Sequence, residues 1–224
     1  VTTGTTPVQA YQILAPLVKD KPYFEHVHYY VVDEFWYAKE PGTQDVDIPV
    51  NKMSMDLKFF QAASIPEERI HTLRDETVDS FDAAIQQTGG MDMVLMGIGT
   101  DGHFCGNHPG TFTNWNQGCH SIDRYCTPQV NQLLEFLLKD DIHSDDVSRI
   151  PDHYLTMGPK TIMDAKNIVM IFSGKGKAET VRRAFFGPVT MDFPVSVFQL
   201  HPHVSVLLDE AAASEIRELL KTGC

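Results

Sequence analysis

The chain has 224 residues, of which 42% are hydrophobic, and a formal net charge of −12 at pH 7. This length predicts a single domain over residues 1–224, the negative charge argues against a nucleic-acid partner, and the longest apolar runs, such as 167–172, are too short to cross a membrane. The four cysteines form no CxxC pair, and no secretory signal pattern is visible, so we expect a cytoplasmic protein.

Apolar runs typical of strands alternate with helical patterns along the chain. The predicted strands are 26–33, 91–98, 167–174, 195–200 and 203–209. The predicted helices are 7–18, 52–63, 78–87, 128–139, 177–186 and 210–221. This alternation predicts an α/β fold with a doubly wound, mostly parallel sheet that carries helices on both faces. Ligands of such sheets bind beyond the carboxyl ends of the strands, and the irregular segments 37–50 and 106–128 follow strand ends there.

The first candidate site is the stretch "TTGTTP" near the start of the chain. Gly4 can adopt the positive φ of a tight turn, Thr5 or Thr6 can cap a helix, and Pro7 fits its first position. Helix N-termini favour anions, so these backbone amides and the hydroxyl groups of Thr3, Thr5 and Thr6 could bind phosphate. The alternative interpretation is a helix that is capped without any ligand.

Two carboxylates, Asp33 and Glu34, directly follow the predicted strand 26–33. A carboxylate that faces a ligand-binding crevice can serve as a general base. A solvated carboxylate at the start of a loop is the plainer interpretation of this motif taken alone.

A glycine-rich loop, "GIGTDGHFCGNHPG", follows the predicted strand 91–98. Its glycines allow close approach of the backbone to a ligand, and Asp101 can fix the tautomer of the His103 imidazole by hydrogen bonding. The pattern predicts that His103 is an acid/base group. His108 could share this role or be structural.

A third strand-to-helix junction, "FSGKGKAE", places Lys177 at the start of a helix. A lysine there opposes the helix dipole unless an anion is bound, so Lys177 is a candidate phosphate ligand, with simple surface charge as the alternative. The two His-x-His pairs, 26/28 and 201/203, have no nearby carboxylate or cysteine and are interpreted as structural. We therefore predict no metal site.

The order "TGTTP", "VVDEFWY", "MGIGTDGHFCGNHPG", "FSGKGKAE" and "FQLHPHVSVLLDEAA" resembles the glucosamine-6-phosphate isomerase/deaminase and 6-phosphogluconolactonase superfamily over nearly the whole chain. The resemblance implies the doubly wound α/β fold. The sequence "DEF" is similar to the deaminase branch, because lactonases usually carry an arginine at the position of Phe35. The segments "KFF", "YLTMG" and "QLHP" are also deaminase-like, whereas "HPGT" resembles the lactonases.

In the deaminase chemistry that the resemblance implies, His103 opens the sugar ring, Asp101 orients His103, and Asp33 moves a proton between C2 and C1. An amino-sugar 6-phosphate thereby becomes a ketose 6-phosphate and ammonia, without cofactor or metal. The phosphate would rest on residues 3–6 and Lys177. In a lactonase, His103 would instead activate water against the lactone carbonyl.

The chain departs from the family pattern in several places. Deaminases normally carry a glutamate at the position of His108, and an imidazole there could shift the pH optimum, change the substrate or abolish deamination. Segment 128–138 lacks the phosphate-clamping arginine that the well-known bacterial deaminases carry there. Segment 111–122 has no basic residue for an allosteric anion site, so we expect no allosteric activation of that kind. The family normally has a strand and a helix before the phosphate loop, and we expect that this segment is missing. A non-catalytic sugar-phosphate sensor is a second alternative function. The sequence is also compatible with more than one sugar epimer as substrate and with a homo-oligomer.

Overall fold

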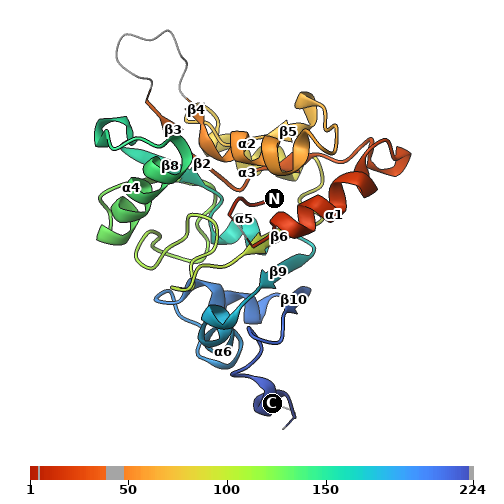
Figure 1. Cartoon of the computed structure of the whole chain (residues 1–224), viewed down its shortest axis with the longest axis vertical. Helices are drawn as coiled ribbons and strands as arrows, with labels where there is room; N and C mark the ends of the chain where they lie inside the picture. Colours follow the sequence, from red (N-terminus) through yellow and green to blue (C-terminus); the bar gives the residue numbers. More distant parts are fainter. Residues whose placement is uncertain (5, 39–47, 222–224) are drawn as a thin grey trace. The chain divides into compact units, whose positions relative to one another are not determined.

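The computed structural model describes residues 1–4, 6–38 and 48–221, with the backbone alone at residues 48, 141 and 142. These residues form two compact units, Val1–Phe81 with Cys119–Met157 and Asp82–Gly118 with Gly158–Cys224. Strands and helices alternate in both units, so the predicted α/β class is confirmed (Figure 1). Within the described ranges, no helix is long and apolar enough to cross a membrane.

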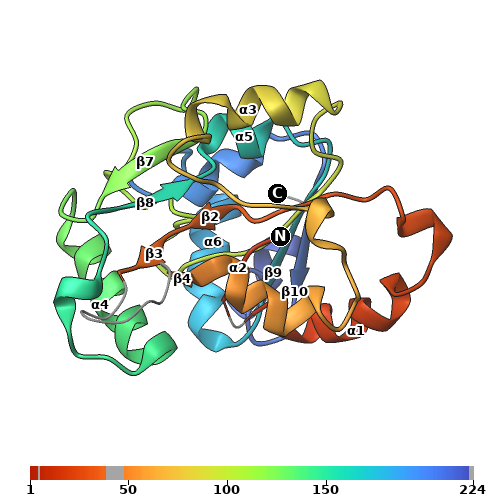
Figure 2. The ribbon, with the colours of Figure 1, turned by 90° about the horizontal axis from the view of Figure 1, so that it is seen from above.

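The first unit combines short strands with three helices and the start of a fourth, α3 (Val78–Gln87), which ends in the second unit. Its helices are α1 (Val8–Val18), α2 (Val50–Met55) and α4 (Pro128–Ile142), with short turns η1 (Pro22–Phe24), η2 (Asp56–Phe60, π-helical), η3 (Glu67–Arg69) and η4 (Val147–Arg149). Its strands are β1 (Tyr29–Tyr30), β2 (Asp33–Glu34), β3 (Trp36–Tyr37), β4 (Ile48–Pro49), β5 (Ile70–His71), β7 (His120–Asp123) and β8 (His153–Thr156). Strands β1 and β5 pair in parallel, whereas β3 and β4 pair antiparallel. The three-stranded sheet β2-β8-β7 is antiparallel as well (Figure 2).

Helix α4 shows why this sequence packs as it does. The side chains of Val130, Leu134 and Leu138 repeat every four residues and are all buried, which gives the helix one apolar stripe. The stripe packs in a cluster with Phe35 and Tyr37, whose rings meet edge to face at 5.3 Å. The hydroxyl group of Thr127 caps the helix by accepting a hydrogen bond from the Val130 N–H.

The second unit contains a parallel sheet of β6 (Val94–Gly97), β9 (Ile168–Phe172) and β10 (Val204–Leu208), in the order β10-β9-β6. Figure 2 shows β9 and β10 side by side. The helical segments are α5 (Pro159–Met163), α6 (Ala178–Phe186) and α7 (Arg217–Lys221), with turns η5 (Lys175–Lys177) and η6 (Pro194–Leu200). In the central strand β9, alternate residues Ile168, Met170 and Phe172 are buried.

Three predicted elements differ from the structure. The predicted strand 195–200 is the 3₁₀ helix η6, because Pro194 at its start presets a helical φ and lacks an N–H for a ladder. The predicted strand 26–33 is divided into β1 and β2, and the backbone N–H groups of Val31 and Val32 bond to His71 and Val1. The predicted helix 210–221 is helical only in α7, since turns occupy the residues before it.

A buried carboxylate joins β2 to α2. The Glu34 side chain is 0% exposed and accepts hydrogen bonds from the backbone N–H groups of Phe35, Asn51 and Lys52, at 3.1, 2.7 and 2.9 Å. Two of these donors belong to the first turn of α2, where orphan N–H groups need acceptors. Burial raises the pKa of Glu34 from 4.5 to about 7, against the opposing effect of these hydrogen bonds, and the nearby Asp33 adds to the rise.

This raised pKa predicts a pH-dependent stability. Between pH 4.5 and about 7 the folded protein retains a proton that the unfolded chain releases, so the unfolding free energy falls as the pH rises through that window. The decrease should be on the order of 3 kcal/mol, and the variant Glu34→Gln should lack it. Urea unfolding at pH 5 and pH 8 measures the difference. The exposed Glu76→Gln is the matched control, and a wild-type decrease that persists in Glu34→Gln would contradict the assignment.

Candidate functional site

The loop after β6 takes its shape from two glycines. Gly102 has φ +82°, and a side chain there would collide with the ring of Phe193. At Gly99 a side chain would collide with His103 and Asp101, so the backbone must pass directly beside these two groups. The loop closes through hydrogen bonds from the Gly99 N–H to the His103 carbonyl and from the Gly102 N–H to the Gly99 carbonyl.

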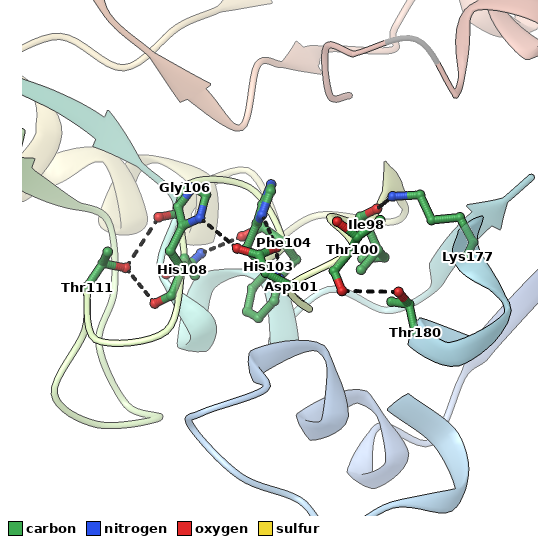
Figure 3. Close-up of polar contacts among 11 residues, drawn as sticks. Ile98, Thr100, Asp101, His103, Phe104, Gly106, His108, Thr111, Lys177 and Thr180 are labelled. Atoms are coloured by element: carbon green, nitrogen blue, oxygen red, sulfur yellow. Dashed lines mark hydrogen bonds and ion pairs between the residues drawn. The ribbon is translucent and has the colours of Figure 1, made fainter. Parts of the chain in front are cut away.

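Within this loop Asp101 and His103 form the pair that the sequence predicts (Figure 3). The Asp101 Oδ1 lies 2.6 Å from His103 Nδ1 and also accepts from the His103 backbone N–H at 3.2 Å. The His103 side chain is 29% exposed, whereas its neighbour Phe104 is fully buried against Phe198. Phe104 therefore anchors the loop and leaves the imidazole partly open to solvent.

His108 completes a three-residue cluster on the same carboxylate. The Asp101 Oδ2 lies 3.2 Å from His108 Nδ1, and the two imidazole rings lie 4.0 Å apart, centroid to centroid. The side chain of His108 is 7% exposed. Its backbone is held by the Thr111 hydroxyl group, which donates to the His108 carbonyl at 2.9 Å. Both oxygens of Asp101 thus contact an imidazole.

The electrostatics of the cluster fix the tautomer of His103. Burial opposes ionisation of Asp101, but the hydrogen bonds to His103 and His108 outweigh it and hold the pKa of this carboxyl well below its usual range. An ionised carboxylate can only accept, so His103 Nδ1 donates to it. The proton on Nδ1 leaves Nε2 as the ring nitrogen that can take a proton from a substrate.

Lys177, the predicted phosphate ligand, lies at the start of α6. Its Nζ donates a hydrogen bond to the carbonyl of Ile98, and Thr180 on the same helix donates to the carbonyl of Thr100 at 3.2 Å (Figure 3). Burial lowers the pKa of Lys177, against the opposing effect of Asp101. One bond to a carbonyl leaves two N–H groups of the ammonium able to contact an anion.

In the first unit, one amide organises the predicted base and the predicted phosphate loop. The Asn51 Nδ2 donates to the carbonyl of Asp33 at 2.8 Å and to its Oδ1 at 2.9 Å. The Asn51 Oδ1 accepts from the Thr3 hydroxyl group at 3.1 Å. Asn51 is 9% exposed, so this amide holds the Asp33 carboxylate in one orientation.

The predicted phosphate loop is only partly described. Gly4 has φ +94°, so its predicted turn conformation is confirmed, whereas Thr5 lies outside the described residues. Helix α1 begins at Val8 with Pro7 as its N-cap, without a side-chain cap bond, so capping by Thr6 is not observed. The reason is that Pro7 itself takes the cap position, one residue later than predicted.

Among the described residues, Asp101, His103 and His108 are the one group of three or more His, Cys, Asp or Glu residues whose ligand atoms lie within 4.8 Å of one another. The His-x-His pairs make other contacts. His28 contacts His71 at 2.8 Å, and His201 Nε2 lies 2.8 Å from the carbonyl of Ala165. These contacts agree with the structural interpretation of both pairs.

The sequence does not single out Asn51 as a site residue. Its signal was an amide residue at the start of a predicted helix, in "PVNKM", and such a residue is ordinarily a helix cap. The hydrogen bonds to Asp33 and Thr3 join residues 18 and 48 positions apart. No local pattern reports contacts at that separation.

Comparison with known proteins places this geometry in a family. The protein-family model described as glucosamine-6-phosphate isomerases/6-phosphogluconolactonase matches residues 1–129 of the chain. The chain is 33% identical over 223 residues to the glucosamine-6-phosphate deaminase of Rhodococcus jostii, with 96% of this chain and 80% of that protein covered. It is 30% identical over 227 residues to the deaminase of Bifidobacterium longum, with the same coverage.

Solved structures agree with the sequence comparison. A monomeric glucosamine-6-phosphate deaminase superposes with a TM-score of 0.73 at 27% identity, covering 96% of this chain and 86% of that one. The 6-phosphogluconolactonase of Trypanosoma cruzi superposes with a TM-score of 0.64 at 17% identity, covering 96% and 83%, which shows the shared fold alone. The matched model spans the phosphate-loop, Asp33 and His103 motifs together, and the chain therefore belongs to the family of glucosamine-6-phosphate isomerases and 6-phosphogluconolactonases.

Proposed function

We propose that this protein isomerises and deaminates an amino-sugar 6-phosphate, either glucosamine 6-phosphate or a close epimer, to a ketose 6-phosphate and ammonia. The observation that carries the proposal is the oriented His103–Asp101 pair, with Nε2 of the imidazole able to take a proton, in a chain that is 33% identical to a protein named glucosamine-6-phosphate deaminase. We place this activity in the cytoplasm and in a single catalytic domain.

His103 opens the pyranose ring in this proposal. Its Nε2 takes the proton of the C1 hydroxyl group, and a proton returned to the ring oxygen breaks the C1–O bond to give the open aldehyde. Asp101 holds the Nδ1 proton throughout and stabilises the imidazolium that forms. His108, on the other oxygen of Asp101, belongs to the same relay because any change in its protonation alters the field at that carboxylate.

Asp33 then carries the proton between the two carbons. Its carboxylate removes the proton from C2, gives an enolamine, and returns the proton to C1. The resulting ketimine takes up one water and releases ammonia, so the products are a ketose 6-phosphate and ammonia. Asn51 donates one hydrogen bond to this carboxylate and one to the Asp33 backbone carbonyl. This suits the transfer, because the base must approach the C2–H bond in a defined orientation.

The phosphate is assigned to the hydroxyl and amide groups of Thr3, Gly4, Thr5 and Thr6 and to the ammonium of Lys177. A lysine contributes a point charge that holds a phosphate without fixing its orientation, and turn amides supply that orientation. In this proposal, these donors supply the positive field that the net charge of −12 does not.

Lactone hydrolysis is the weaker alternative. The sequence relatives described above carry the deaminase name, whereas the Trypanosoma cruzi lactonase shares 17% identity and thus only the fold. The His103–Asp101 geometry is intact, and this argues against a sugar-phosphate sensor without turnover.

The variant Asp33→Asn tests the proposed proton transfer. It should reduce the exchange of the C2 proton of glucosamine 6-phosphate in D₂O by a factor of roughly 10²–10⁴, because a general base contributes that much. NMR follows the exchange while a coupled assay follows ammonia, with galactosamine 6-phosphate measured in parallel.

The exposed Asp152→Asn is the matched control and should keep wild-type rates. Full exchange in Asp33→Asn would remove Asp33 as the base. Exchange without ammonia release would indicate an isomerase. Hydrolysis of 6-phosphogluconolactone that needs His103 but not Asp33 would favour the lactonase.

The variant Asn51→Asp tests whether Asn51 positions the base. It removes the Nδ2 donor and places a second carboxylate beside Asp33, so we expect kcat/KM to fall at least about tenfold and its acid limb to move to higher pH. A loss of fold stability alone would leave the pH profile of the remaining activity unchanged. The control is Asn167→Asp, an exposed asparagine with one backbone bond, for which we expect an unchanged profile.

A further inference from the structure

The Asp101, His103 and His108 side chains have the spacing of a metal ligand set. Their candidate ligand atoms all lie within 4.8 Å of one another, with 2.6 Å between Asp101 Oδ1 and His103 Nδ1 and 3.2 Å between Asp101 Oδ2 and His108 Nδ1. Bonds of about 2.0–2.1 Å place the ligands of a tetrahedral ion roughly 3.3 Å apart. Small side-chain rotations would therefore bring all three donors onto one ion.

The chemistry of the donors selects the class of ion. Two imidazole nitrogens and one carboxylate oxygen suit zinc and its neighbours Co²⁺, Ni²⁺ and Cu²⁺, whereas Mg²⁺ and Ca²⁺ prefer oxygen ligands. Binding requires an ionised carboxylate and unprotonated nitrogens at the ion.

In this cluster, His108 is buried and held in place, whereas Asp101 and His103 are accessible to solvent. The His108 side chain is 7% exposed, and hydrogen bonds from its backbone N–H to Gly106 and from Thr111 to its carbonyl hold it in place. The side chains of Asp101 and His103 are 44% and 29% exposed, so an ion can enter and retain a water ligand. Figure 3 shows the three side chains converging within the one loop.

Other histidine contacts among the described residues supply only two donors. His153 Nε2 lies 2.7 Å from Asp75 Oδ1, and His28 lies 2.8 Å from His71. His108 is the residue that turns an ordinary His–Asp pair into a three-donor set. Family resemblance predicts a glutamate at this position, so the second imidazole is a particular feature of this chain.

We propose that Asp101, His103 and His108 bind a divalent transition-metal ion of the zinc class, and that this ion inhibits the enzyme. Binding is inferred from the cluster itself, whereas inhibition rests on the proposed function.

Inhibition follows from the tautomer of His103. A metal ion on Nδ1 displaces the proton that this nitrogen donates to Asp101, and the neutral imidazole then carries its proton on Nε2. That nitrogen can no longer accept the proton of the sugar hydroxyl group. The ion therefore blocks ring opening without occupying the phosphate site, and removal of the ion restores activity.

The test is a titration of the EDTA-treated full chain with Co²⁺, followed by visible absorption, and with Zn²⁺, followed by calorimetry. We expect one ion per chain and an affinity at least about tenfold lower in both His108→Gln and Asp101→Asn, because each removes one of three ligands. Thermal melts test whether each variant is folded. Asp101 is more exposed than His108, so we expect its substitution to disturb the fold less. His153→Gln, which breaks a two-donor pair, should bind as the wild type does.

Absence of stoichiometric binding to the wild type, or wild-type affinity in both cluster variants, would overturn the site. Zn²⁺ should also inhibit ammonia release in a manner that EDTA reverses, and binding at the cluster without inhibition would overturn the inhibitory role. The Co²⁺ titration needs no substrate, so a protein that lacks deaminase activity still reports whether the metal site exists.

Discussion

The Asp101 carboxylate is the group on which the loop after β6 depends, because each of its oxygens contacts a different imidazole. This single anion orients His103 and draws His108 into the same cluster. It is stable as an anion because the contacts with the two imidazoles outweigh the cost of its partial burial. The loop backbone also favours this arrangement, because a side chain at position 99 would displace both His103 and Asp101, and glycine has none.

The first unit uses a second carboxylate in a different way. Glu34 is fully buried and serves as acceptor for three backbone N–H groups, so its role is to join β2 to the first turn of α2. That junction fixes Asn51, which in turn fixes Asp33 and contacts Thr3. The two adjacent carboxylates therefore have different roles, and the difference follows from their burial. The buried Glu34 is structural, whereas the half-buried Asp33 is the candidate base.

His108 links the proposed function to the metal proposal. A glutamate at this position would add a second negative charge beside Asp101, whereas an imidazole can share the carboxylate as a hydrogen-bond donor. The same substitution supplies a third ligand atom for a cation of the zinc class. In the two proposals, one residue thus takes part in the acid/base relay and makes it sensitive to metal ions.

The sequence by itself determined the α/β class, the positions of helices such as α3 and α6, the Asp101–His103 pair and the family, because these depend on periodicity and on residues close together in the chain. It did not determine that 194–200 is helical, since a short apolar run such as "VSVF" fits a buried strand and a buried helical turn equally well, and residues 194–198 are all buried. The buried state of Glu34 and the contacts of Asn51 were also decided only by the tertiary structure. Residues 17 and 48 positions apart meet there, and such contacts arise from packing across elements, which leaves no local pattern in the sequence.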